Sequence, residues 1–147
     1  MNNVKPADLQ AMVLSILRIT TAYMFMLHGS AKLLGFPHAE MFDGLQLMSL
    51  YGAAGILELV GGVLLLLGLF TRPVAFILSG MMAVAYFIGH VAEGGNIAVP
   101  FLNGGEAAAL FSFIFLYFSV AGGGNGRWII NVTLLKNCFY CFSDRHS

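Results

Sequence analysis

Residues 49–70 read SLYGAAGILELVGGVLLLLGLF and contain one charged residue, Glu58. As a helix this stretch rises about 33 Å, because each residue adds about 1.5 Å, so it can cross the roughly 30 Å hydrocarbon core of a bilayer. Ala54, Gly55 and Gly62 share one side of the helix with Glu58. Small residues on that side let a neighbouring helix approach closely. The stretch therefore predicts a membrane-spanning helix whose Glu58 side faces other helices.

Three further apolar stretches lie around this one, at about residues 11–34, 73–92 and 106–123. Short breaks rich in glycine, proline and asparagine separate the four stretches. The sequence thus predicts an all-α integral membrane protein. We expect a four-helix bundle within residues 1–128, followed by a cytoplasmic or interfacial tail at 129–147.

The amino-acid composition supports a membrane protein and argues against a nucleic-acid-binding protein. Hydrophobic residues make up 59% of the chain, charged residues make up 10%, and the mean hydropathy is +0.84. A soluble domain carries roughly 25% charged residues, so lipid must be the solvent for much of this surface. The formal net charge is zero and no basic block occurs, which excludes a nucleic-acid-binding protein.

Lysine and arginine are unevenly distributed among the predicted connections. Short cytoplasmic loops of membrane proteins carry an excess of these residues. One side of the predicted bundle carries Lys5, Arg72, Arg127, Lys136 and Arg145. The other side carries Lys32 at a helix edge, together with Glu40, Asp43, Glu93 and Glu106. This asymmetry predicts that both termini are cytoplasmic.

The polar residues of each predicted span fall on one stripe at helical spacing. The first stripe holds Arg18, Thr21, Phe25, His28 and Lys32. The third span contributes Ser79, Ala83, Tyr86, His90 and Glu93, and the fourth contributes Glu106, Phe113, Tyr117 and Gly124. Charged side chains are costly in hydrocarbon and usually face a bundle interior. We therefore expect the stripes to share one interior. The phenylalanines of the fourth span point to several sides of the helix, so we expect them to pack mostly against lipid: Phe111, Phe113, Phe115 and Phe118.

Depth along the helices places three of these residues in one layer near the outer face. His28, His90 and Glu106 each lie roughly 26 Å from the inner end of their helix. Lys32 and Glu93 would lie just above this layer. We expect His28 and His90 to exchange protons, Lys32 to attract an anion, and Glu93 or Glu106 to tune the histidines.

Two further groups of residues would complete the site. Asn103, at the entry to the fourth helix, is a further expected substrate-binding residue. Arg18 and Glu58 differ by about 8 Å in predicted height, so they could form a supporting ion pair that fixes helix register. A proton relay between Arg18 and Glu58 is the alternative.

Simpler roles compete with each of these interpretations. In the simpler interpretation, His28 and His90 hydrogen-bond to backbone or to each other near the headgroups, and Lys32 extends to the membrane interface without binding a ligand. Paired histidines on facing helices can hold haem. No CxxCH motif is present, however, and we expect neither haem nor another metal. Cys138 and Cys141 form a CxxC pair in the tail, for which we expect a reduced, interfacial state; thiol exchange is the alternative.

Several of these residues, taken in order, resemble the signatures of the DoxX family. Arg18 followed by His28-Gly29-x-x-Lys32-Leu33 resembles the first-helix signature. Glu58-x-x-Gly61-Gly62 and the segment 67–72 resemble the second, and residues 103–106 resemble the entry to the fourth helix. The glycines at 122–124 and Trp128 resemble its exit, whereas residues 127–131 depart from the Ser-Leu-Asp segment common in the family.

The resemblance implies a small bacterial protein of the cytoplasmic (inner) membrane. The family is similar to the DoxD-type subunit of thiosulfate–quinone oxidoreductase, and some of its members act with redox partners. We therefore predict a membrane redox component that handles a quinone or a small sulfur or oxyanion substrate together with a partner protein. The alternatives are a subunit of a small-solute transporter or channel, which would require homo-oligomers, and a scaffold or assembly protein without catalysis.

Overall fold

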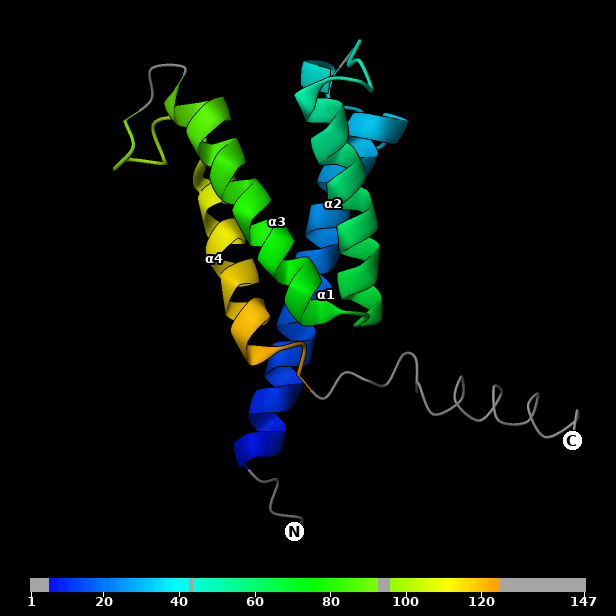
Figure 1. Ribbon diagram of the computed structural model, residues 1–147, viewed down its shortest axis with the longest axis vertical. Helices are drawn as coiled ribbons and strands as arrows, with labels where there is room; N and C mark the ends of the chain where they lie inside the picture. The colour runs from blue at the N-terminus through cyan, green and yellow to red at the C-terminus, as the bar shows by residue number, and fades with distance from the viewer. Residues whose placement is uncertain (1–5, 43, 93–95, 125–147) are drawn as a thin grey trace, which may run out of the picture.

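The computed structural model describes residues 6–42, 44–92 and 96–124, and these form four helices without a strand among them (Figure 1). The helices are α1 (Pro6–Leu34), α2 (Leu50–Leu67), α3 (Thr71–Tyr86) and α4 (Glu106–Ala121). A 3-10 turn, η1 (Glu40–Phe42), lies between α1 and α2, and a π-helical segment, η2 (Phe87–Val91), continues α3. The predicted all-α four-helix fold is confirmed.

Three helical segments are long and apolar enough to cross a membrane: α1, α2 and the continuous helix from Thr71 to Val91. The fourth helix, α4, is apolar but has only 16 residues, or about 24 Å of rise. This helix covers residues 106–121 of the expected span at about 106–123. Gly122 has a positive φ of 80°, outside the α-helical region, so the helix ends at Ala121.

Helices α1 and α2 pack closely because glycines remove side chains from their interface. A methyl group built on Gly29 would lie 2.6 Å from the backbone nitrogen of Leu59, and one on Gly55 would lie 3.1 Å from Cβ of Lys32. No larger residue fits at Gly29 without separating the helices. Helices α1 and α2 therefore form one tight hairpin, as small residues allow in membrane proteins.

Helices α3 and α4 form a second hairpin that is fixed by reciprocal hydrogen bonds. The hydroxyl of Ser79 donates to the carbonyl of Ser112 at 2.9 Å, and the hydroxyl of Ser112 donates to the carbonyl of Ser79 at 3.2 Å. Interhelical bonds of this kind lock two helices at one height where no water competes.

A tight connection joins the two hairpins at one end of the bundle. Gly68 ends α2 in the left-handed conformation, and Phe70 precedes α3 with a φ of 48°. We call this the closed end, and we call the opposite end, with the connections 35–49 and 92–105, the open end. Figure 1 shows α2 and α3 meeting at the closed end and diverging toward the open end.

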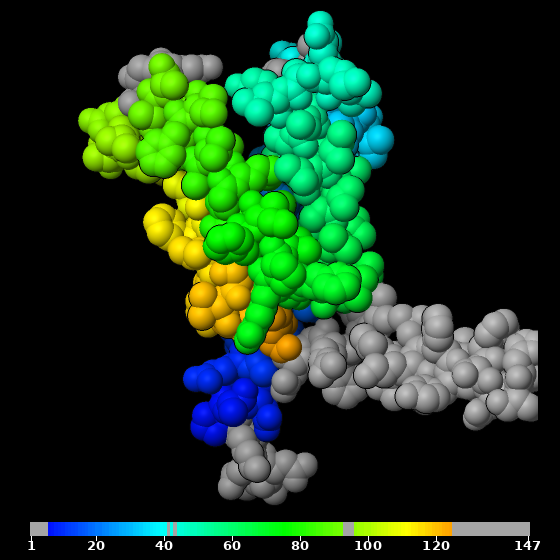
Figure 2. All heavy atoms as spheres, viewed as in Figure 1, coloured from blue at the N-terminus to red at the C-terminus, as the bar shows by residue number. Residues whose placement is uncertain are grey.

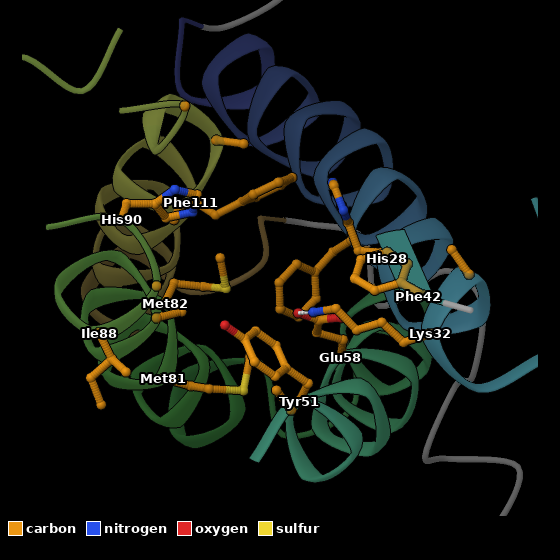
Figure 3. Close-up of a pocket in the computed structure, with 18 of the residues that line it drawn as sticks. His28, Lys32, Phe42, Tyr51, Glu58, Met81, Met82, Ile88, His90 and Phe111 are labelled. Atoms are coloured by element: carbon orange, nitrogen blue, oxygen red, sulfur yellow. Dashed lines mark hydrogen bonds and ion pairs between the residues drawn. The ribbon is translucent and has the colours of Figure 1, made fainter. Parts of the chain in front are cut away.

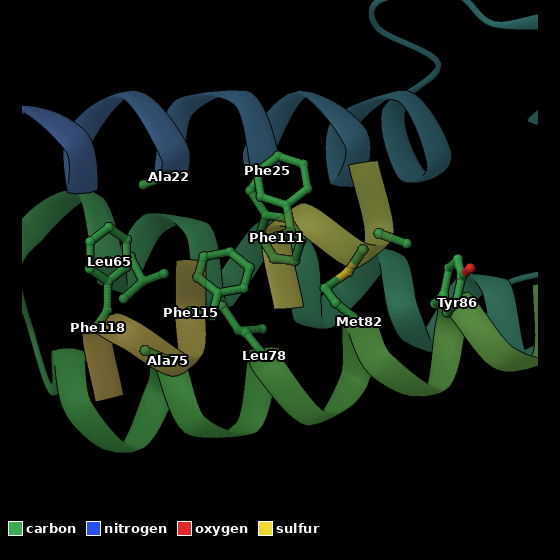
Figure 4. Close-up of a cluster of buried hydrophobic side chains, with 11 residues drawn as sticks. Ala22, Phe25, Leu65, Ala75, Leu78, Met82, Tyr86, Phe111, Phe115 and Phe118 are labelled. Carbon is green, nitrogen blue, oxygen red and sulfur yellow. The ribbon is translucent and has the colours of Figure 1, made fainter. Parts of the chain in front are cut away.

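The buried core lies where the two hairpins meet (Figure 4). The rings of Phe25 and Phe115 approach edge to face, with centroids 4.8 Å apart. Phe111, Phe115 and Phe118 are buried, whereas Phe113 is 71% exposed. The expected orientation of α4 is thus wrong, because Phe113 and Tyr117, expected in the interior, are both exposed.

Candidate functional site

A cleft of about 1000 Å³ separates the two hairpins at the open end. Figure 2 shows the surface hollowed there between α2 and α3. All four helices contribute to its walls, and the side chains of Phe25, Met82 and Phe111 lie at its buried side. Most of the lining is apolar, so the few polar groups that reach the cleft define its chemistry.

The main polar feature of the cleft is an ion pair between α1 and α2. Lys32 Nζ donates a hydrogen bond of 2.6 Å to Oε1 of Glu58, and the two side chains are 12% and 5% exposed. The Lys32 ammonium also lies 5.6 Å from the centre of the Phe42 ring, within the range of a cation–π interaction. Glu58 Oε2 is buried and has no hydrogen-bond partner within the described chain. Figure 3 shows the pair projecting into the cleft.

The predicted ion pair between Arg18 and Glu58 is therefore wrong. Arg18 is 2% exposed and lies at the closed end, about ten residues along α2 from Glu58, or roughly 15 Å. A methyl group built on Gly123 would lie 2.5 Å from Nη1 of Arg18, and one on Gly68 would collide with the same guanidinium. Gly68 and Gly123 follow the C-terminal ends of α2 and α4, where a cation is favourable. Arg18 thus packs α1 against two helix ends.

The two predicted histidines both line the cleft, but their environments differ. His28 is exposed within it, and its ring meets Phe111 edge to face at 6.0 Å. His90 is half-buried, and its Nδ1 lies 3.0 Å from the carbonyl oxygen of Asn103. A carbonyl only accepts hydrogen bonds, so Nδ1 of His90 carries the proton in this contact. Of these two histidines, only His90 forms a hydrogen bond with the backbone of the described residues.

Asn103 organises the connection that closes one edge of the cleft. Its side-chain oxygen accepts from the backbone nitrogen of Gly105 at 2.9 Å, and its side-chain nitrogen donates to the hydroxyl of Tyr86 at 3.4 Å. Tyr86 in turn donates to the carbonyl of Ile97 at 2.9 Å. The residue also lines the cleft, but its amide group is engaged in shaping the loop.

The remaining predicted acidic residues are not brought to the cleft. Glu106 is exposed in the first turn of α4 and does not line it. A carboxylate is favourable at a helix N-terminus, which accounts for its position. The expected layer of His28, His90 and Glu106 is thus reduced to the two histidines. Glu93 and the Cys138/Cys141 pair lie outside the described residues.

Phe42, Tyr51 and Met81 are among the residues of the cleft that were not predicted as site residues. Tyr51 lies seven residues before Glu58, two helical turns along the same side of α2, and that spacing could have identified it. Phe42 lies in an irregular connection and Met81 on an apolar helix, so neither has a periodic signal.

No group of three or more histidine, cysteine, aspartate or glutamate side chains is arranged to hold a metal ion within residues 6–42, 44–92 and 96–124. The side chains of the cleft that can form hydrogen bonds with a ligand include one ammonium, one carboxylate, two imidazoles and the Tyr51 hydroxyl. Such a set can donate hydrogen bonds to a carbonyl or an anion and can transfer protons.

Comparison with known proteins identifies the family. The sequence model described as DoxX matches residues 13–91, which include all of α2 and α3 and most of α1. A protein of Haemophilus influenzae, described as uncharacterized, is 51% identical over 117 residues, which cover 76% of this chain and 84% of that protein. No solved structure matches the chain. The chain is a multi-pass membrane protein, and it belongs to the DoxX family.

Proposed function

We propose that the chain is the quinone-binding component of a membrane redox system and acts with a partner protein that supplies electrons. The observation that carries the proposal is the cleft at the open end, which combines apolar walls with an ion pair and an exposed histidine. An apolar pocket with a few convergent polar groups is the usual form of a site for a small amphiphilic ligand.

The polar groups of the cleft suit both redox forms of a quinone. The carbonyl oxygens of the oxidised ring accept hydrogen bonds, and Lys32 has three N–H donors, of which Glu58 Oε1 uses one. The hydroxyls of the reduced ring donate hydrogen bonds, and the carboxylate of Glu58, which lines the cleft, can accept them.

The residues of the cleft would manage protons rather than electrons. A quinone takes up two electrons and two protons when it becomes a quinol. His28 is exposed in the cleft, and an imidazole can both accept and donate a proton, so it can pass protons from water to the bound ring. Lys32, held by Glu58 and Phe42, would fix the ring oxygen next to it. The sequence has no flavin or nicotinamide fingerprint, so we assign the electrons to a partner that oxidises a small sulfur compound.

The same proposal includes an orientation in the bacterial inner membrane. The closed end carries Arg72, and Lys5 and Arg127 lie before α1 and after α4 in the sequence. By the positive-inside rule we place the closed end in the cytoplasm and the cleft at the periplasmic side. Reporter fusions near Arg72 should then give cytoplasmic signals, and fusions near Asn96 periplasmic ones. The reverse result would overturn the orientation.

Quinone binding to purified protein in nanodiscs tests the proposal directly. Wild-type protein should bind ubiquinone saturably, and Lys32→Met/Glu58→Leu should remain folded but lose most of this binding. His38→Gln is the matched control, because His38 is exposed in a connection and does not line the cleft. Absence of saturable binding to the wild type, or unchanged binding to the double variant, would contradict the proposal.

The role of His28 is tested in cells rather than by binding. His28→Gln preserves one hydrogen bond, but an amide cannot take up and release a proton, so the variant should bind quinone and fail to complement a deletion of the gene. His38→Gln should complement fully. Full complementation by His28→Gln would remove the proton-transfer role.

A further inference from the structure

We infer that the ligand enters the cleft sideways from the membrane, through a portal between α2 and α3, and carries an apolar tail that stays in this portal. The inference rests on the proposed quinone site and names its substrate class: a quinone with a long isoprenoid tail. It predicts that the head group alone, without the tail, is a poor ligand.

The connectivity of the bundle produces the portal. Helix α2 packs on α1, and α3 packs on α4, each with its own interhelical contacts. Between α2 and α3 the chain is continuous only through Gly68–Phe70 at the closed end. Away from this connection the two helices diverge, and their facing sides border the cleft at the open end (Figures 1 and 2).

The opposite side of the cleft, between α1 and α4, is filled by aromatic side chains. The centroid of the Phe25 ring lies 5.4 Å from that of Phe111 and 4.8 Å from that of Phe115. His28 adds an edge-to-face contact with Phe111 above them. Because these rings are in contact, a chain-like ligand cannot leave the cleft on this side.

The side between α2 and α3 is lined by Tyr51 and by small or flexible residues, and no cluster of packed rings from the described residues fills it. Ala54 on α2 and Ala85 on α3 line the cleft and are half-buried, and Met81 is a flexible neighbour. Figure 3 shows Tyr51 and Met81 on this side, across the cleft from His28 and Phe111. The two alanines leave space that a larger side chain would close.

The distribution of polar groups and the volume of the cleft indicate an amphiphile. The ion pair comes from α1 and α2, whereas the α3 side contributes mostly alanine, methionine and isoleucine. A volume of about 1000 Å³ is at the upper end of the range for drug-sized ligands and exceeds the need of a single quinone ring. The portal residues lie in helices long and apolar enough to span the membrane, so lipid rather than water borders the opening.

Phenylalanine substitutions that plug the portal test the inference. Ala54→Phe and Ala85→Phe place a ring between α2 and α3, and the matched controls Ile56→Phe and Ile77→Phe place the same ring on exposed positions that do not line the cleft. Long-tailed ubiquinone should bind the plugged variants about tenfold more weakly, in the range expected for overpacking. Binding of the tailless benzoquinone head should be weak in the wild type and unchanged by the plugs. Equal losses for both ligands, or none for the tailed one, would overturn the portal.

A second measurement needs no quinone and separates the portal from the proposed function. In a Phe111→Trp/Trp128→Phe background the only tryptophan lines the cleft, and lipids brominated on their acyl chains quench it if chains enter. Quenching should fall when Ala85→Phe is added and stay unchanged with Ile77→Phe. Portal-dependent quenching without quinone binding would overturn the quinone and retain the portal. Quenching that is insensitive to the plug would overturn the portal.

Discussion

The ion pair between Lys32 and Glu58 allows us to predict how substitutions at these two positions change the free energy of unfolding, in direction and in magnitude. At 2.6 Å, two unit charges attract by about 6 kcal/mol at an effective dielectric constant of about 20. Taking both charges out of water costs a comparable amount, so the net contribution of the pair is small. Removing one partner leaves the other charge buried, which costs about 3–5 kcal/mol. We therefore expect Lys32→Met to destabilise strongly and Lys32→Met/Glu58→Leu to recover most of the loss.

The two single variants should differ because their geometry differs. Lys32 lies in the last turn of α1 at the open end, so without Glu58 its long side chain can extend to the interface. Glu58 lies in the middle of α2 and is 5% exposed, so without Lys32 its carboxylate cannot reach water. The loss in Lys32→Met should therefore exceed the loss in Glu58→Leu.

Unfolding of purified protein in mixed micelles, followed by circular dichroism, measures these free energies. A double-mutant cycle between Lys32 and Glu58 should give a large coupling energy. The same cycle between Arg18 and Glu58 is the control and should be additive, because these residues lie about 15 Å apart along the bundle. Additive losses at Lys32 and Glu58, or coupling of Glu58 to Arg18, would refute the reasoning.

Three further substitutions test the packing by the same assay. Gly29→Ala should cost about 1–3 kcal/mol, because the added methyl meets the α2 backbone at 2.6 Å, whereas Gly80→Ala, with open space around it, should be neutral or slightly stabilising. Gly123→Ala should destabilise by displacing a buried guanidinium whose Nη1 lies 2.5 Å from the new methyl, and a neutral result would remove its packing role. Tyr86→Phe should cost about 1 kcal/mol through the lost hydroxyl bond, and an unchanged melting temperature would show that the loop does not need it.

The sequence alone determined the class of the protein and the number of its helices within the described residues. Length and hydropathy of a span are local properties, because a helix must match the thickness of the bilayer wherever its neighbours lie. The ends of α2 are equally local, since Ser49 caps its start and Gly68 adopts the left-handed conformation after it. The predicted inward orientation of the polar stripe of α1 was correct because charged side chains on an apolar helix are costly in lipid and therefore face the interior of the bundle.

Only the tertiary structure decided which side of α4 is buried. Lipid and protein core are both apolar, so an entirely apolar helix has no periodic signal that separates them. The sequence favoured the side with Phe113 and Tyr117, whereas the structure buries Phe111, Phe115 and Phe118.

The partner of Glu58 was also decided by the tertiary structure. Arg18 and Lys32 lie on the same stripe of α1, so helical spacing could not choose between them. The choice depends on how far α1 slides along α2, and that register is set by the close approach at Gly29 and Gly55. The register places Lys32 beside Glu58 in the cleft and leaves Arg18 at the closed end, because contacts between helices, rather than the pattern within one helix, fix their relative height.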